Sequence, residues 1–261
     1  MRTPWQLRVP AAVAAAFLVL PLVGLLFRVP WLHLPDLFRE PIVGEALRLS
    51  LLCATIAALL AAVTGIPLAW LLARSTGRLT GLVRALVTVP LVLPPVVGGV
   101  ALLSAFGRRG LLGKPIDVVF GFSLPVTPFG VIVAETFVAL PFLVLTVEGA
   151  FRTLDDGYGE AAATLGASPW FAFRRVVLPM MAPALLAGTV LAWARALGEF
   201  GATITFAGNS PGRTQTMPLA VYLAMERDPD AASALSLVML VVCVVVLALL
   251  RGRWLTTGSA A

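Results

Sequence analysis

Charged residues are scarce in this sequence. Asp, Glu, Lys and Arg together make up 12% of the 261 residues, whereas hydrophobic residues make up 59%. A soluble domain is typically about one quarter charged and about half apolar. With so few polar side chains, a water-soluble fold of this length could not be covered, and a soluble globular protein is excluded. The composition instead favours a protein whose solvent is largely lipid.

Lysine, cysteine and histidine are nearly absent. Lys114 is the only lysine beside 18 arginines, and these are scattered among apolar runs. A nucleic-acid-binding arm would show a block of cations, so we expect no nucleic-acid partner. Cys53 and Cys243 both lie in apolar runs and indicate nothing about redox compartment. His33 has no Cys or His neighbours in the sequence, and we expect no metal site.

A phosphate-binding P-loop is also lacking. The stretch 107–114 has a similar spacing, but Arg108 stands where the first glycine is required and Pro115 follows Lys114. We find no set of residues that forms a catalytic centre, and we predict that this chain binds no cofactor of its own.

Six apolar runs are long enough to cross the hydrocarbon core, which needs about 20 helical residues. They cover 10–27, 46–73, 83–106, 127–147, 181–207 and 234–250. The sequence therefore predicts an all-α integral membrane protein with one transmembrane domain over 1–261. Arg2 and Arg8 precede the first run as in a signal peptide, but no small-residue cleavage site follows, so we favour an uncleaved anchor helix.

The third run carries helix breakers. It contains Pro90, Pro94 and Pro95, followed by the glycine pair 98–99. Proline removes a backbone donor and clashes with the preceding turn, so this helix must bend or open. Two interpretations remain open, namely a simple packing kink and a broken helix that lines a water-filled path.

The connection 152–179 has the pattern of two short helices joined by a turn. Asp155 and Asp156 suit the N-terminus of the first helix, and Gly166 suits its C-terminal cap. Ser168 is a natural N-cap with Pro169 at the first helical position. We expect Pro179 to end the second helix.

This connection resembles the cytoplasmic signature of the inner-membrane permeases of bacterial and archaeal ABC importers. That signature is Glu-Ala-Ala, three residues, Gly, nine residues, Ile, one residue, Leu-Pro. The residues that match it, with Val in place of Ile, are Glu160, Ala161, Ala162, Gly166, Val176, Leu178 and Pro179. The resemblance implies a coupling helix that docks into the ATP-binding subunit. The competing interpretation is an amphipathic segment at the membrane surface.

The resemblance also implies the orientation. If 152–179 is cytoplasmic, both termini are cytoplasmic and the chain is a multi-pass protein of the cell (inner) membrane. Basic residues alone do not decide this, because ten lie on the predicted cytoplasmic side and eight on the other.

The fifth run contains charges. Arg195 and Glu199 are four residues apart and share a helix face. An ionised side chain in the membrane is costly unless it is paired or hydrated, and such residues are functional by default. They line a pathway or gate, or they pair structurally with each other or with Glu135. Small residues beside them permit close helix approach; these are Ala194, Gly198, Gly201 and Thr205.

The stretch 194–218 resembles the oxyanion branch of these permeases, which imports molybdate, tungstate, sulfate or thiosulfate, and is most similar to the molybdate permease subunits. Our candidates for the translocation pathway or gate are Pro94, Pro95, Arg195, Gly198, Glu199, Phe200, Gly201 and Thr203. The resemblance implies several partners: a second copy of the chain, two ATP-binding subunits that hold ATP and Mg²⁺, and an extracytoplasmic oxyanion-binding protein.

Three alternatives are weighed against a molybdate or tungstate importer. A sulfate or thiosulfate ABC permease shares the core of the motif. An ion-driven secondary transporter would use embedded carboxylates as proton carriers, but it leaves the signature in 152–179 without a purpose. An intramembrane enzyme built on Glu135, Arg195 and Glu199 would need a nucleophile or metal ligands in the spans, and the sequence offers neither.

Overall fold

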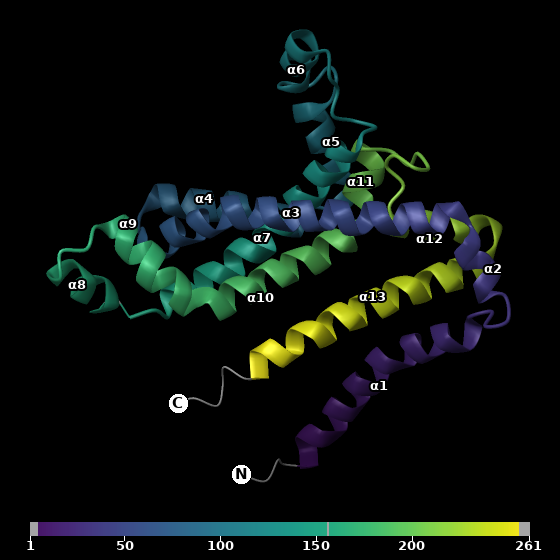
Figure 1. Ribbon diagram of the computed structural model, residues 1–261, viewed down its shortest axis with the longest axis horizontal. Coiled ribbons are helices and arrows are strands. Elements are labelled where there is room, and N and C mark those ends of the chain that lie inside the picture. The colour runs from purple at the N-terminus through teal and green to yellow at the C-terminus, as the bar shows by residue number, and fades with distance from the viewer. Residues whose placement is uncertain (1–4, 156, 256–261) are drawn as a thin grey trace.

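The computed structural model describes residues 5–155 and 157–255, and every regular element in these ranges is helical. The helices are α1 (Trp5–Arg28), α2 (Leu34–Arg39), α3 (Pro41–Arg74), α4 (Arg78–Val92), α5 (Pro95–Phe106), α6 (Gly113–Phe120), α7 (Pro128–Arg152), α8 (Gly157–Thr164), α9 (Pro169–Ala172), the π-helix η1 (Phe173–Val177), α10 (Leu178–Leu197), α11 (Gly201–Phe206), α12 (Met217–Arg227) and α13 (Pro229–Leu255). The predicted all-α class is confirmed for these residues. Figure 1 shows their arrangement.

Five helical segments within the described ranges are long and apolar enough to cross a membrane. They are α1, α3, α7, α13 and the continuous segment formed by α9, η1 and α10. Four of the predicted runs fall on α1, α3, α7 and α13. The other two, 83–106 and 181–207, are each interrupted.

The predicted run 83–106 is two helices rather than one. α4 ends at Val92 and α5 begins at Pro95, with Leu93 and Pro94 extended between them (ψ 131° and 135°). A residue that precedes proline is driven out of the helical region, and Pro94 and Pro95 have no N–H to donate. The run therefore opens at Leu93–Pro94, and α5 projects steeply away from α3 (Figure 1).

The predicted run 181–207 is also divided. α10 already begins at Leu178 and ends at Leu197, and the short α11 covers Gly201–Phe206. Phe200 between them has a non-helical backbone (φ −129°, ψ −57°). We expected one continuous helix because the apolar pattern continues through this stretch. The helix is interrupted because the buried carboxylate of Glu199 caps α11, as described below.

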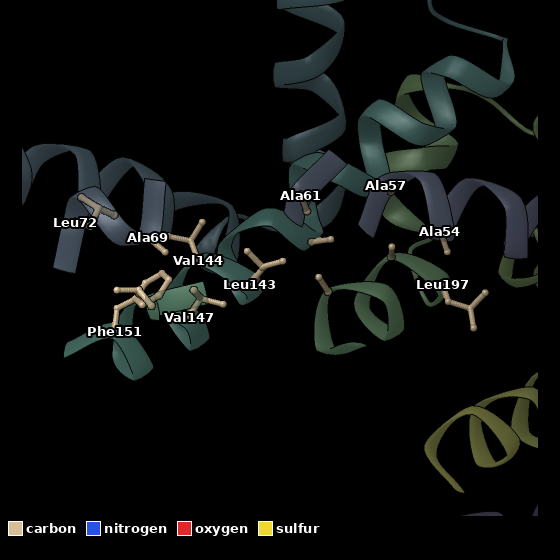
Figure 2. Close-up of a cluster of buried hydrophobic side chains, with 14 residues drawn as sticks. Ala54, Ala57, Ala61, Ala69, Leu72, Leu143, Val144, Val147, Phe151 and Leu197 are labelled. Atoms are coloured by element: carbon tan, nitrogen blue, oxygen red, sulfur yellow. The ribbon is translucent and has the colours of Figure 1, made fainter. Parts of the chain in front are cut away.

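The core lies where α3, α7 and α10 pack together. Small side chains on α3 recur at Ala54, Ala57 and Ala61, all fully buried, and they let α7 and α10 approach closely. Larger side chains of α7 and α10 fill the remaining space, among them Leu143 and Leu197 (Figure 2). Because lipid is as apolar as these side chains, close packing rather than exclusion of water stabilises such an interface.

The first and last long helices lie at the edge of this bundle. None of the residues of α1 is buried, and the helix lies beside α13 (Figure 1). An apolar helix of 24 residues with no buried side chain needs lipid or another protein around it. This agrees with an integral membrane protein.

Candidate functional site

The signature residues form two helices joined by a tight turn, which we name the coupling segment (residues 152–179). Gly166 ends α8 with φ +82°, a conformation that favours glycine. The N–H of Gly166 donates to the carbonyl of Ala163 (2.9 Å), and that of Ala167 donates to the carbonyl of Ala162 (3.0 Å). This pair of bonds is the Schellman arrangement, which satisfies the last carbonyls of a helix. The cap predicted at Gly166 is present.

Both helix starts in the coupling segment use side-chain oxygens. The N–H of Phe171 donates to Ser168 Oγ (3.3 Å), and Pro169 takes the first helical position. Before α8, the N–H of Gly157 donates to Asp155 Oδ1 (2.9 Å). Asp156, which we also expected to favour this N-terminus, lies outside the described residues. The predicted helix–turn–helix is present between Asp155 and Phe171.

The prediction for Pro179 is wrong, because the helix continues through it. The π-helix η1 precedes Pro179, and the N–H of Leu178 donates to Phe173 O, five residues back. Pro179 has no N–H to donate, so one bond of the helical ladder is lost at this turn in any case. The wide turn therefore accommodates the proline, and α9, η1 and α10 form one segment.

Four signature residues line one open groove of about 750 Å³ on the coupling segment: Ala161, Ala162, Gly166 and Val176. Apolar side chains beside them are exposed, and Leu165 is 88% and Trp170 67% accessible. Glu160 lines a different pocket, and Leu178 and Pro179 are the first two residues of α10. Exposed apolar side chains around a groove are typical of a surface that another protein covers.

The second region combines the two helix interruptions, and we name it the break region (Leu93–Pro95 and Arg195–Gly201). Arg195 Nη2 lies 2.6 Å from Glu199 Oε2. Glu199 is 1% exposed, and its Oε1 accepts the N–H of Ala202 at 2.8 Å. A single carboxylate therefore neutralises the arginine and caps α11. The sequence left two partners open, Glu199 and Glu135, and in the structure Arg195 pairs with Glu199.

The two interruptions meet at Pro95 and Gly201. A Cβ atom on Gly201 would lie 2.6 Å from Pro95 Cβ, closer than real Cβ atoms approach. One turn further along each helix, a Cβ on Gly99 would lie 2.5 Å from Thr205 Cβ. The absence of a side chain at both glycines lets α5 and α11 pack with their backbones close together.

A pocket of about 110 Å³ opens between the two interruptions. It is lined by Pro90, Leu91, Leu93, Pro95, Gly98, Phe137, Val138, Phe142 and Arg195. Arg195 is its only charged lining residue and keeps 26% of its side chain accessible. The partly neutralised guanidinium of Arg195 therefore lies beside the interruption between α4 and α5.

Three further pathway candidates, Gly198, Phe200 and Thr203, do not line this pocket and lie in different environments. Gly198 is exposed, and Thr203 is fully buried with no hydrogen-bond partner for Oγ1 among the described residues. Phe200 turns toward α12, where its ring centroid lies 5.2 Å from that of Tyr222. A hydrogen bond with Glu226 raises the pKa of Tyr222. Phe200 thus contacts α12 and does not line the pocket.

Two features of the structure were not predicted from the sequence. The buried Glu148 pairs with both Arg84 and Arg152 at 2.8 Å, which ties α4 to the C-terminal end of α7. Its spacing to Arg152 is four residues, a signal that could have predicted one of the two pairs. Trp70 packs against aromatic rings of two other helices, a contact that no local pattern predicts.

Comparison with known proteins decides the family. Residues 65–255 match the family model of the inner membrane component of binding-protein-dependent transport systems. The chain belongs to this family. It is therefore an ABC importer permease, a multi-pass protein of the inner membrane that works with a binding protein, and it is a translocation subunit rather than an enzyme.

Two relatives and one solved structure illustrate the similarity. The molybdenum transport system permease protein ModB of Mycobacterium tuberculosis is 47% identical over 243 residues, 93% of this chain and 92% of the relative. The sulfate transport system permease protein CysT of Escherichia coli is 37% identical over 227 residues, 85% of this chain and 82% of the relative. The crystal structure of a bacterial ABC transporter that imports the acidic polysaccharide alginate matches with a TM-score of 0.76 and 17% identity over 96% of this permease and 94% of that chain, and supports the fold alone.

Proposed function

We propose that this permease carries molybdate, and tungstate as an oxyanion of the same shape and charge, into the cytoplasm by ATP-driven alternating access. The observation that carries the proposal is the 47% identity to a molybdenum permease along 93% of the chain. The oxyanion-branch motif in 194–218, which includes the paired Arg195 and Glu199, supports the same substrate class.

The assembly that fits this function contains two copies of the permease, two ATP-binding subunits and an external binding protein. The coupling segment supports docking on the ATP-binding subunit because its groove and the exposed Leu165 and Trp170 need a protein partner. ATP and Mg²⁺ bind the partner, since this sequence has no P-loop. In this assembly the coupling segment and both termini face the cytoplasm.

The break region is the proposed gate of the pathway. Arg195 can attract a dianion to the pocket between the two interrupted helices, but Glu199 neutralises most of its charge. A site of this kind passes an anion without holding it tightly, because the paired carboxylate competes with the substrate. High-affinity capture then belongs to the binding protein.

Sulfate is the second candidate, supported by the 37% identity to a sulfate permease. Sulfate and molybdate are both tetrahedral dianions, so the pathway alone does not separate them. A sulfate system commonly pairs two unlike permease chains. Composition of the assembly therefore distinguishes the two proposals.

The test uses the complex purified from its native membrane together with its binding protein. Intact-complex mass spectrometry should find two identical permease chains, and ATP hydrolysis should rise when the binding protein carries molybdate or tungstate. Two unlike permease chains, or stimulation by sulfate and not by molybdate, would reject the molybdate proposal in favour of sulfate.

A further inference from the structure

The coupling segment contacts the membrane helices through a row of aromatic rings. Trp170 stacks on Phe173 with ring centroids 5.9 Å apart, and Phe173 lies 5.1 Å from Trp70 of α3. Trp70 in turn meets Phe151 of α7 edge to face at 5.1 Å. The row therefore leads from the start of α9, through η1, into two of the three helices that form the core.

Trp70 is the residue at which these contacts converge. On top of the two ring contacts, the guanidinium of Arg74 lies 4.6 Å from the Trp70 ring centroid. Phe151 is 1% exposed and belongs to the core cluster, where Figure 2 shows it at the same end as Leu72 of α3. One end of the row is thus fixed in the bundle.

The other end of the row is loosely held. α8 packs on α9 and η1 within the coupling segment, and a pocket of about 400 Å³ separates α8 from the end of α3. Trp70 and Arg74 line this pocket on the α3 side, and Glu160 and Ala163 of α8 line it on the other. Figure 1 shows α8 and α9 beyond the ends of α3, α7 and α10.

We infer that Trp70 is a positioning residue for coupling, the contact through which displacement of the coupling segment moves α3 and α7. Packed aromatic rings resist compression, so a push on Phe173 is transmitted to Trp70 and Phe151. Without the indole, Phe173 would lose its contact with α3, and movement of the coupling segment would reach the bundle only through the continuous α9–η1–α10 segment. The inference depends on the proposed docking of the coupling segment on an ATP-binding subunit.

The test compares Trp70→Ala, which removes contacts of α3 with α7 and η1, with the loss of a second tryptophan that joins α10 to α3. Trp193 of α10 donates from Nε1 to Thr55 Oγ1 of α3 (3.2 Å), remote from the coupling segment. Complete complexes are reconstituted in liposomes, with Cys53 and Cys243 replaced by alanine and a cysteine at Leu191, which is 44% exposed one turn before Arg195. ATP hydrolysis and the nucleotide-dependent change in labelling of Leu191→Cys are measured on each preparation.

Trp70→Ala should retain ATP hydrolysis within about twofold and lose most of the nucleotide-dependent labelling change, at least fivefold. Trp70→Phe should restore most of this change, and Trp193→Ala should leave it intact. Phe173→Leu should resemble Trp70→Ala, and the double variant should lose no more than either, because both remove one contact. If Trp70→Ala fails to assemble, the labelling change in Phe173→Leu tests the inference in its place.

An unaltered labelling change in Trp70→Ala or Phe173→Leu would overturn the inference, as would an equal loss in Trp193→Ala. The labelling readout needs no transported substrate. Failure of the parent complex to take up molybdate would therefore contradict the proposed substrate, but the labelling change would still test the role of Trp70.

Discussion

Arg195 and Glu199 form an ion pair of 2.6 Å across the point where α10 ends and α11 begins. The two partners differ in environment, since Glu199 is 1% exposed and the side chain of Arg195 is 26% exposed. Removing one partner of a buried pair leaves an uncompensated charge, at a cost of about 3–5 kcal/mol. Because Glu199 is the more deeply buried, Arg195→Met should destabilise the complex more than Glu199→Gln. Thermal unfolding of the purified complex measures both.

The double variant separates structure from transport. Arg195→Met with Glu199→Gln removes both charges and keeps an oxygen that can accept the N–H of Ala202, so assembly should largely recover. Transport should stay low if Arg195 serves the pathway. Recovery of both would make the pair purely structural, and single variants with parental stability would contradict its burial.

The contact between Pro95 and Gly201 predicts a second effect. Gly201→Ala places a methyl group 2.6 Å from Pro95 Cβ, and overpacking of this kind typically costs about 1–3 kcal/mol. Gly44→Ala on α3 is the matched control, because no atom of the described residues lies within 4 Å of its added Cβ. The thermal midpoint should fall for Gly201→Ala and stay unchanged for Gly44→Ala. Equal midpoints would show that α5 and α11 are not in close contact.

Much of the fold followed from local patterns. The caps at Gly166 and Ser168 were predicted because φ > 0 and N-terminal N–H groups impose residue types that a sequence displays directly. The interruption at Glu199 was not predicted, because the apolar pattern of 181–207 continues through it. Only the tertiary burial of the Glu199 carboxylate makes it the cap of α11.

Two other features depend on tertiary contacts. Pro179 was expected to end a helix, which is its usual effect, but the wide turn of η1 absorbs the missing donor. The Trp70 contacts join residues more than 80 positions apart in the chain. Hydropathy and spacing carry no information about such pairs, whereas the signature in 152–179 predicted the family, which the comparison confirms.

The turn of the coupling segment gives a third prediction. Gly166→Pro fixes φ near −65°, against +82° in the structure, and deletes the N–H that donates to Ala163. Uptake should be lost while the protein stays in the membrane and its thermal midpoint is preserved, since α8 packs mainly on α9 and η1 of the same segment. Glu160→Lys should also reduce uptake, because it reverses an exposed charge of the coupling segment. Gly149→Ala is the control, because its added Cβ meets no atom within 4 Å in the part of the chain that the structure describes. Normal ATP-driven uptake by both variants would contradict the docking assignment.

Orientation gives a fourth prediction. Leu165 in the coupling segment and Leu111 between α5 and α6 are 88% and 81% exposed. Single cysteines at these positions, in a chain without Cys53 and Cys243, should react with a membrane-impermeant reagent from opposite sides. Leu111→Cys should label in intact cells and Leu165→Cys only in inverted vesicles. Labelling of both in intact cells would overturn the cytoplasmic placement of the coupling segment.

ATP-driven import of molybdate is measured most directly as uptake of radiolabelled molybdate by liposomes that contain the whole complex, its binding protein and internal ATP. Accumulation should require ATP and an active ATP-binding subunit. Excess tungstate should abolish it, and an equal excess of sulfate should leave it nearly unchanged. Accumulation that persists without ATP, or that sulfate suppresses as strongly as tungstate does, would contradict the proposed function.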